Sequence, residues 1–124
     1  MHPRGRSPPP PPIHGEWFAS HTDGDTALEL TIDIEEPAPH FIVGDARLEV
    51  TEPDELPLVV LGYMTGSFHY PFVEMNFKLF VAAGQDPVEA RFEGRYGIGG
   101  IGGDFVLANP IGRADTLPLI LRRR

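Results

Sequence analysis

The chain has 124 residues, of which 14 are glycine and 14 are proline, and this proportion argues against long helices. The length supports one hydrophobic core and argues against a catalytic domain with a separate cofactor domain. The formal net charge is −8, and because half of the basic residues lie at the two ends, residues 15–121 are strongly acidic. Such a body repels phosphate backbones, so we do not expect a nucleic-acid partner.

The chain contains no cysteine, so it has no disulfide, no thiolate metal site and no cysteine nucleophile. Its histidines do not show the spacing of metal ligands. We therefore expect neither a metal nor a cofactor. No apolar stretch reaches the roughly 18 residues that a membrane span requires, and residues 1–12 lack the apolar centre of a signal peptide. These features predict a cytoplasmic protein without a membrane span.

Composition divides the chain into three predicted segments. Residues 8–12 are consecutive prolines, which adopt an extended polyproline helix and bury nothing, so residues 1–14 are expected to be a disordered tail. Residues 15–121 are expected to form a single β-barrel domain, and the arginines at 122–124 a basic tail.

The first strands are predicted from alternating side chains. Residues 27–34 alternate between apolar and polar side chains, a pattern that a helix would scatter around its surface. The Asp-Gly pair at residues 23–24 supplies the positive φ that a tight turn needs. Residues 17–21 and 27–34 are therefore predicted to pair as an antiparallel hairpin.

The middle of the chain predicts three more strands. Residues 46–50 alternate in the same way, and Pro53 ends the strand. Residues 58–70 are rich in valine, leucine and aromatic residues, which favour strands. Residues 72–83 fit both a helix and a strand. We interpret them as a strand because their neighbours are strands and their β-branched and aromatic content is high.

The last part of the chain continues the pattern. Residues 88–96 alternate, and residues 101–107 and 117–121 carry further apolar positions. Residues 97–102 match the G-x-G-x-x-G string of dinucleotide-binding folds. No helix can follow this string here, so we interpret it as a glycine-rich turn or a bulge at a barrel rim.

About eight apolar-facing runs joined by short turns predict an all-β fold with antiparallel, meander-like pairing. Eight such strands can close into an up-and-down barrel, which removes exposed sheet edges. A two-sheet β-sandwich is the alternative. A barrel of this size holds either packed side chains or one small ligand.

Aromatic side chains are predicted to line the interior and to bind a small ligand, while Tyr63 or His69 sets its orientation. In an enzyme, a barrel-facing His69 or Tyr96 would serve as the acid or base. His21 and His69 are candidates for a pair of histidines that face each other across one mouth of the barrel. The predicted ligand-binding residues are Trp17, Tyr63, His69, Phe77, Phe92, Tyr96 and Phe105.

Some predicted strands carry apolar residues on both faces, including the face that should meet water. In a lone barrel such a stripe is exposed, so we expect it to contact another subunit, another domain or the tail. A sandwich that buries both faces is the alternative reading. The predicted interface residues are Val59, Leu61, Phe80 and Ile120.

Six short segments stand in a recognisable order: residues 28–34, residues 62–63 leading to 71–73, residues 77–80, 95–96, 104–107 and 115–117. In this order they resemble the β-rich accessory region beside the flavin domain of some bacterial cholesterol oxidases of the glucose-methanol-choline type and of related multidomain proteins. The resemblance implies a β-domain next to lipid or sterol chemistry, with the flavin elsewhere, and it transfers no catalytic residue to this chain.

The general pattern also resembles that of lipocalin-like barrels, which hold small apolar ligands. The one stretch at the start of the chain to compare with their Gly-x-Trp signature is Gly15-Glu16-Trp17.

These observations lead to three functional hypotheses. The first is a non-catalytic barrel module that binds a small apolar ligand, such as a lipid or sterol, or a partner domain. The second is a small-barrel isomerase or cyclase that uses His69 or Tyr96. The third is a structural interaction domain with a filled core. The apolar stripe also allows a homo-oligomer.

Overall fold

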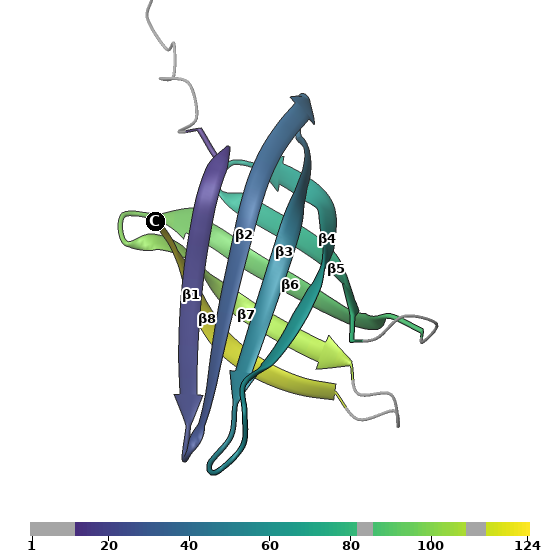
Figure 1. Ribbon diagram of the computed structural model, residues 1–124. Helices are drawn as coiled ribbons and strands as arrows, with labels where there is room; N and C mark the ends of the chain where they lie inside the picture. Colours follow the sequence, from purple (N-terminus) through teal and green to yellow (C-terminus); the bar gives the residue numbers. More distant parts are fainter. Residues whose placement is uncertain (1–11, 82–85, 109–113) are drawn as a thin grey trace, which may run out of the picture.

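The computed structural model describes residues 12–81, 86–108 and 114–124, and it is a closed barrel of eight antiparallel strands (Figure 1). Each strand pairs with its neighbours in sequence, and β8 returns to β1. The predicted up-and-down barrel is therefore confirmed, and the described residues contain no helix. The strands are β1 (Gly15–Asp23), β2 (Thr26–Ala38), β3 (Phe41–Thr51), β4 (Leu58–His69), β5 (Phe72–Phe80), β6 (Val88–Gly97), β7 (Gly100–Ala108) and β8 (Ala114–Arg123).

Residues that fitted either a helix or a strand form β5, which ends at Phe80. Burial alternates at every residue along this strand, as expected for a sheet with one face in the core and one in solvent. Residues 82–83 of the predicted strand lie outside the described residues.

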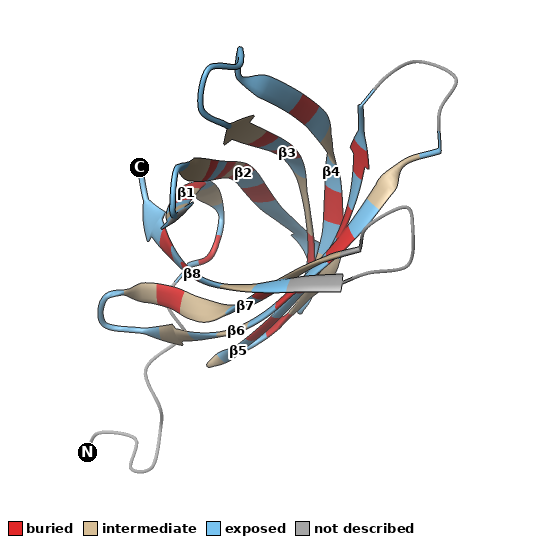
Figure 2. Ribbon diagram, turned by 90° about the horizontal axis from the view of Figure 1, so that it is seen from below, coloured by how far each residue is buried: buried red, intermediate tan, exposed pale blue. Residues whose placement is uncertain are grey.

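Buried residues alternate with exposed ones along the strands of the barrel (Figure 2), and every buried residue in the described part of the chain is apolar. Four aromatic residues are at most 1% exposed, and the rings of Phe77 and Phe105 lie 5.6 Å apart in an edge-to-face arrangement. Among the described residues no polar side chain is buried. The barrel therefore has a dry, packed core. The largest fully buried side chains of the core are those of Trp17, Phe77, Phe92 and Phe105.

Glycine on the inner face allows neighbouring strands to approach closely. At Gly62 of β4, a Cβ atom would overlap the backbone carbonyl of Lys78 on β5. The close approach of β5 to β4 therefore requires a residue without a side chain at this position.

The chain closes one end of the barrel with residues before β1. Ile13 is fully buried, and its carbonyl accepts a hydrogen bond from the Trp17 indole at 2.8 Å. From β8, the Arg123 guanidinium lies 4.5 Å from the centre of a Trp17 ring and donates to the carbonyl of His14 at 2.7 Å. The barrel thus includes Ile13 and Arg123 and extends beyond the expected range of 15–121. Residues 1–11 of the expected tail lie outside the described residues.

The glycine-rich segment forms the turn between β6 and β7. Gly97 pairs with Gly100, and Gly100 has a φ of 132°, which favours glycine. The interpretation of this segment as a turn is confirmed. No helix in the described part of the chain is long and apolar enough to cross a membrane.

Candidate functional site

Four of the predicted ligand-binding residues lie in the packed core. Trp17, Phe77, Phe92 and Phe105 are at most 1% exposed, and they pack against other side chains of the core. Tyr96 is half-buried near the closed end, where its hydroxyl donates to the carbonyl of Pro12 at 3.4 Å. An internal ligand would therefore have to displace core side chains.

Tyr63 and His69 lie on the outside of the barrel. The neighbours Met64 and Phe68 are buried, so the alternation of β4 turns Tyr63 and His69 outward. The expectation of a barrel-facing His69 is therefore wrong. Among the described residues no polar side chain is fully buried, and of the two predicted acid or base groups Tyr96 is the one that packs against the core, beside Trp17.

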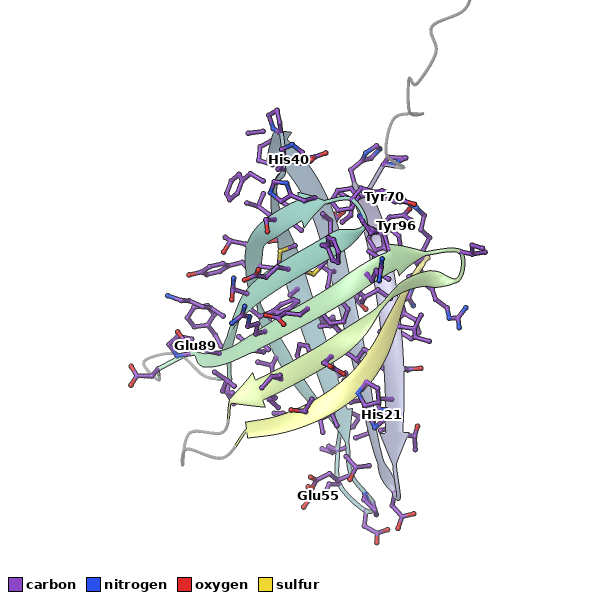
Figure 3. All side chains as sticks on the ribbon, turned by 180° about the vertical axis from the view of Figure 1, so that it is seen from behind. His21, His40, Glu55, Tyr70, Glu89 and Tyr96 are labelled. Atoms are coloured by element: carbon purple, nitrogen blue, oxygen red, sulfur yellow. The ribbon has the colours of Figure 1, made fainter. Side chains whose placement is uncertain are left out.

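The histidines do not meet across a barrel mouth. The His69 ring stacks on His40, with ring centres 4.2 Å apart and an interplanar angle of 13°. His21 lies toward the opposite end from His40 (Figure 3). In the part of the chain that the structure describes, no group of three or more histidines and carboxylates is placed to hold a metal ion.

The predicted interface residues of β4 and β5 form one exposed apolar patch. Leu61 pairs with Phe80 across the two strands, and the rings of Tyr63 and Phe80 lie 6.1 Å apart. Their exposed fractions are 58% for Leu61, 43% for Phe80 and 44% for Tyr63. We call Val59, Leu61, Tyr63 and Phe80 the β4–β5 patch.

Charged residues flank the β4–β5 patch on both sides. On β3, Asp45 pairs with Tyr63, and on β5, Lys78 pairs with the same tyrosine. Two residues along each strand, Arg47 of β3 and Phe80 of β5 both pair with Leu61. The acidic Asp45 and the basic Lys78 therefore lie at the same register position on the two sides of β4.

Ile120 does not belong to this patch. It is half exposed on β8 and pairs with Gly102 of β7, far around the barrel from β4. The sequence pattern predicted Ile120 as an interface residue because it is an apolar residue on the outer face of its strand, between the inward-facing Leu119 and Leu121.

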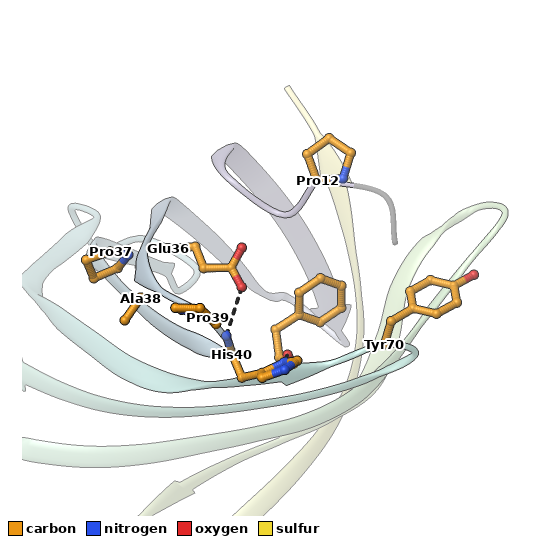
Figure 4. A pocket seen from close by; sticks show the side chains of 8 residues that line it. Pro12, Glu36, Pro37, Ala38, Pro39, His40 and Tyr70 are labelled. Atoms are coloured by element: carbon orange, nitrogen blue, oxygen red, sulfur yellow. Dashed lines mark hydrogen bonds between the residues drawn. The ribbon is translucent and has the colours of Figure 1, made fainter. Parts of the chain in front are cut away.

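Sequence reasoning missed an open pocket of about 440 Å³ at the end of the barrel (Figure 4). Three segments that are distant in sequence form it: the residue before Ile13, the β2–β3 turn and the β4–β5 turn. We call it the end pocket. It is lined by Pro12, Glu36, Pro37, Ala38, Pro39, His40, Phe68 and Tyr70.

Comparisons with family models, curated proteins and solved structures found no match to this chain. The eight-stranded barrel is established by the structure itself. The resemblance to an oxidase accessory region and to lipocalin-like barrels stays a prediction beyond that fold.

Proposed function

We propose that this chain is a non-catalytic β-barrel interaction module whose β4–β5 patch binds a second copy of the chain. The observation that carries the proposal is an apolar patch left exposed on a barrel whose own interior is full. Solvent-exposed apolar side chains in contact with one another mark interaction surfaces more often than isolated ones do.

Because core side chains fill the interior, a function at the outer face is favoured over the binding of a ligand inside the barrel. A lipid- or sterol-sized molecule needs a preformed apolar cavity, and the aromatic residues predicted to line it pack against each other instead. The lipid or sterol ligand that the family resemblance implies stays a prediction. For the same reason an isomerase or cyclase is not the function that we propose.

The charges around the patch favour a second copy as the partner. In a two-fold dimer with its axis along β4, the β3 side of one copy lies over the β5 side of the other. Asp45 then faces Lys78 of the second copy, and Arg47 faces the ring of Phe80, while Leu61 and Tyr63 meet their own counterparts. The patch and its flanking residues are therefore complementary to themselves in charge.

The apolar part of this proposal is tested by sedimentation velocity on wild type, Phe80→Lys and Phe72→Lys. Phe72 is a matched control because it is an exposed phenylalanine on the same strand, eight residues from Phe80. We expect a wild-type dimer, at least a tenfold weaker dimer for Phe80→Lys, whose lysine would face Arg47 of the second copy, and no change for Phe72→Lys. The proposal is contradicted if the wild-type chain stays monomeric up to about 1 mM, because a dissociation constant above that concentration is too weak for a stable complex.

The charged part is tested by reversing one charge at a time. Asp45→Lys and Lys78→Asp each place like charges opposite each other at both contacts of a two-fold dimer, so each variant alone should be monomeric. When the two variants are mixed, both contacts again join a lysine to an aspartate, and a heterodimer should form. Native mass spectrometry distinguishes the species, and a mixture that stays monomeric would rule out this arrangement.

A further inference from the structure

The end pocket is built from groups that hold each other in place. In the β2–β3 turn, His40 has a φ of 66°, and its backbone N–H donates to Glu36 Oε2 at 3.2 Å. The Phe68 backbone N–H donates to the His40 carbonyl at 3.0 Å. The β2–β3 turn is thereby fixed against the β4–β5 turn, and the pocket between them is preformed.

The end of β2 and the turn that follows it bring one carboxylate and one histidine ring to the end pocket. The His40 Nδ1 atom lies 3.0 Å from the Phe68 carbonyl oxygen. Because a carbonyl can only accept, Nδ1 donates this hydrogen bond, which holds the ring against β4. Glu36 is the one charged side chain among the residues that line the pocket, and its carboxylate is exposed.

The remaining lining is apolar and aromatic. The rings of Phe68 and Tyr70 meet edge to face with centres 6.3 Å apart, and the prolines at positions 12, 37 and 39 form other walls. Aromatic faces attract cations, and proline rings pack against flat or aliphatic groups. The formal charge of −8 on the whole chain also attracts cations and repels anions.

We propose that the end pocket binds a small organic cation, with its ammonium group at Glu36 and its apolar body against Phe68 and Tyr70. The volume of about 440 Å³ lies in the range of small-molecule sites. This site is separate from the β4–β5 patch and shares no residue with it, so the two proposals stand or fall independently.

The proposal is tested on the full chain by NMR titration with three probes of similar size: benzyltrimethylammonium, benzyl alcohol and benzoate. Backbone resonances of residues 36–40 and 68–70 should shift with the cation and hardly at all with the neutral or anionic probe. Equal binding of the neutral probe, shifts elsewhere on the barrel, or no binding of any probe overturns the proposal.

Two variants test the roles of the carboxylate and the ring. Glu36→Gln keeps an acceptor for the His40 N–H, so the turn should be retained while affinity for the cation falls at least fivefold. Tyr70→Leu removes an aromatic face that packs against the apolar body of the cation, so affinity for the benzyl probe should also fall. Glu74→Gln is the control, since Glu74 is an exposed carboxylate that binds Arg91 outside the pocket. An unchanged affinity in Glu36→Gln would contradict the assignment.

Discussion

Arg123 joins the end of the chain to its beginning through one side chain. Its guanidinium covers the Trp17 ring and donates to backbone carbonyls of Pro12 and His14. Trp17 in turn donates to the carbonyl of Ile13, which fills the end of the barrel. A cation over an aromatic ring and hydrogen bonds from a charged group both contribute to stability.

Replacing Arg123 by alanine should lower the free energy of unfolding by about 1–2 kcal/mol, since it removes these hydrogen bonds and the contact with the ring. Urea denaturation followed by fluorescence is suited to this test because Trp17 is the single tryptophan of the chain. Arg122→Ala is the control, because Arg122 makes a single 3.4 Å hydrogen bond to Gly99. Equal losses in the two variants would show that the Trp17 contact contributes nothing.

Gly62 is predicted to tolerate no side chain. An alanine Cβ would overlap the backbone of Lys78, which cannot rotate away as a flexible side chain can. We expect Gly62→Ala to destabilise the barrel by about 2–4 kcal/mol through this overpacking. Gly99→Ala, where a Cβ meets nothing within 4 Å, should change stability by less than about 0.5 kcal/mol. Thermal unfolding by circular dichroism measures both variants.

Residue orientation was predictable from the sequence wherever the period of two was followed strictly. It placed Trp17, Phe77, Phe92 and Phe105 inside, where the structure has them. The expectation for His69 is wrong because its position in the alternation of β4 puts it on the outer face. Leu61 and Tyr63 point outward, and the same alternation along β4 places His69 outside.

At the scale of elements, the seam between β1 and β8 differs from the other pairings. β1 and β8 pair at Trp17 with Arg123 and at Phe18 with Arg122, whereas β1 and β2 pair along all of β1. The extent of this closure depends on the stagger of strands around the barrel, which no single segment of sequence encodes. The seam was therefore not predictable from local patterns.

We expect hydrogen exchange to be fastest along this seam. Residues 19–22 of β1 pair with β2 alone, whereas residues 43–48 of β3 pair with strands on both sides. Backbone groups without a partner strand lack the hydrogen bonds that slow exchange. Exchange followed by mass spectrometry should therefore label residues 19–22 before residues 43–48, and the reverse order would show that β1 and β8 pair more extensively.

The end pocket also depends on geometry that strand patterns do not encode. The register of β2 and β3 shifts between Glu35 and Ala38, and His40 adopts a left-handed conformation. Together these features bring Glu36, His40 and Phe68 to one place. A local signal existed in the two prolines at 37 and 39, which mark an irregular strand end, but it did not indicate which distant turn would lie against it.

At the scale of the whole molecule, the barrel stabilises itself through a dry core and leaves apolar side chains on one outer face. The sequence predicted both the core and most of this face, because each follows from alternation on individual strands. It could not show that Val59, Leu61, Tyr63 and Phe80 are contiguous, or that Asp45 and Lys78 flank them symmetrically. Those relations come from the register of β3, β4 and β5.

The most direct test of association through β4 is the distance between spin labels in the dimer. The native chain has no cysteine, so Thr65→Cys gives one nitroxide on the outer face of β4, next to the patch, and Ser20→Cys gives one on β1. Facing sheets pack about 10 Å apart, so the labels at position 65 of two copies should lie within about 25 Å of each other. Labels at position 20 should be much farther apart. A dimer in which position 20 gives the short distance and position 65 the long one would contradict the account.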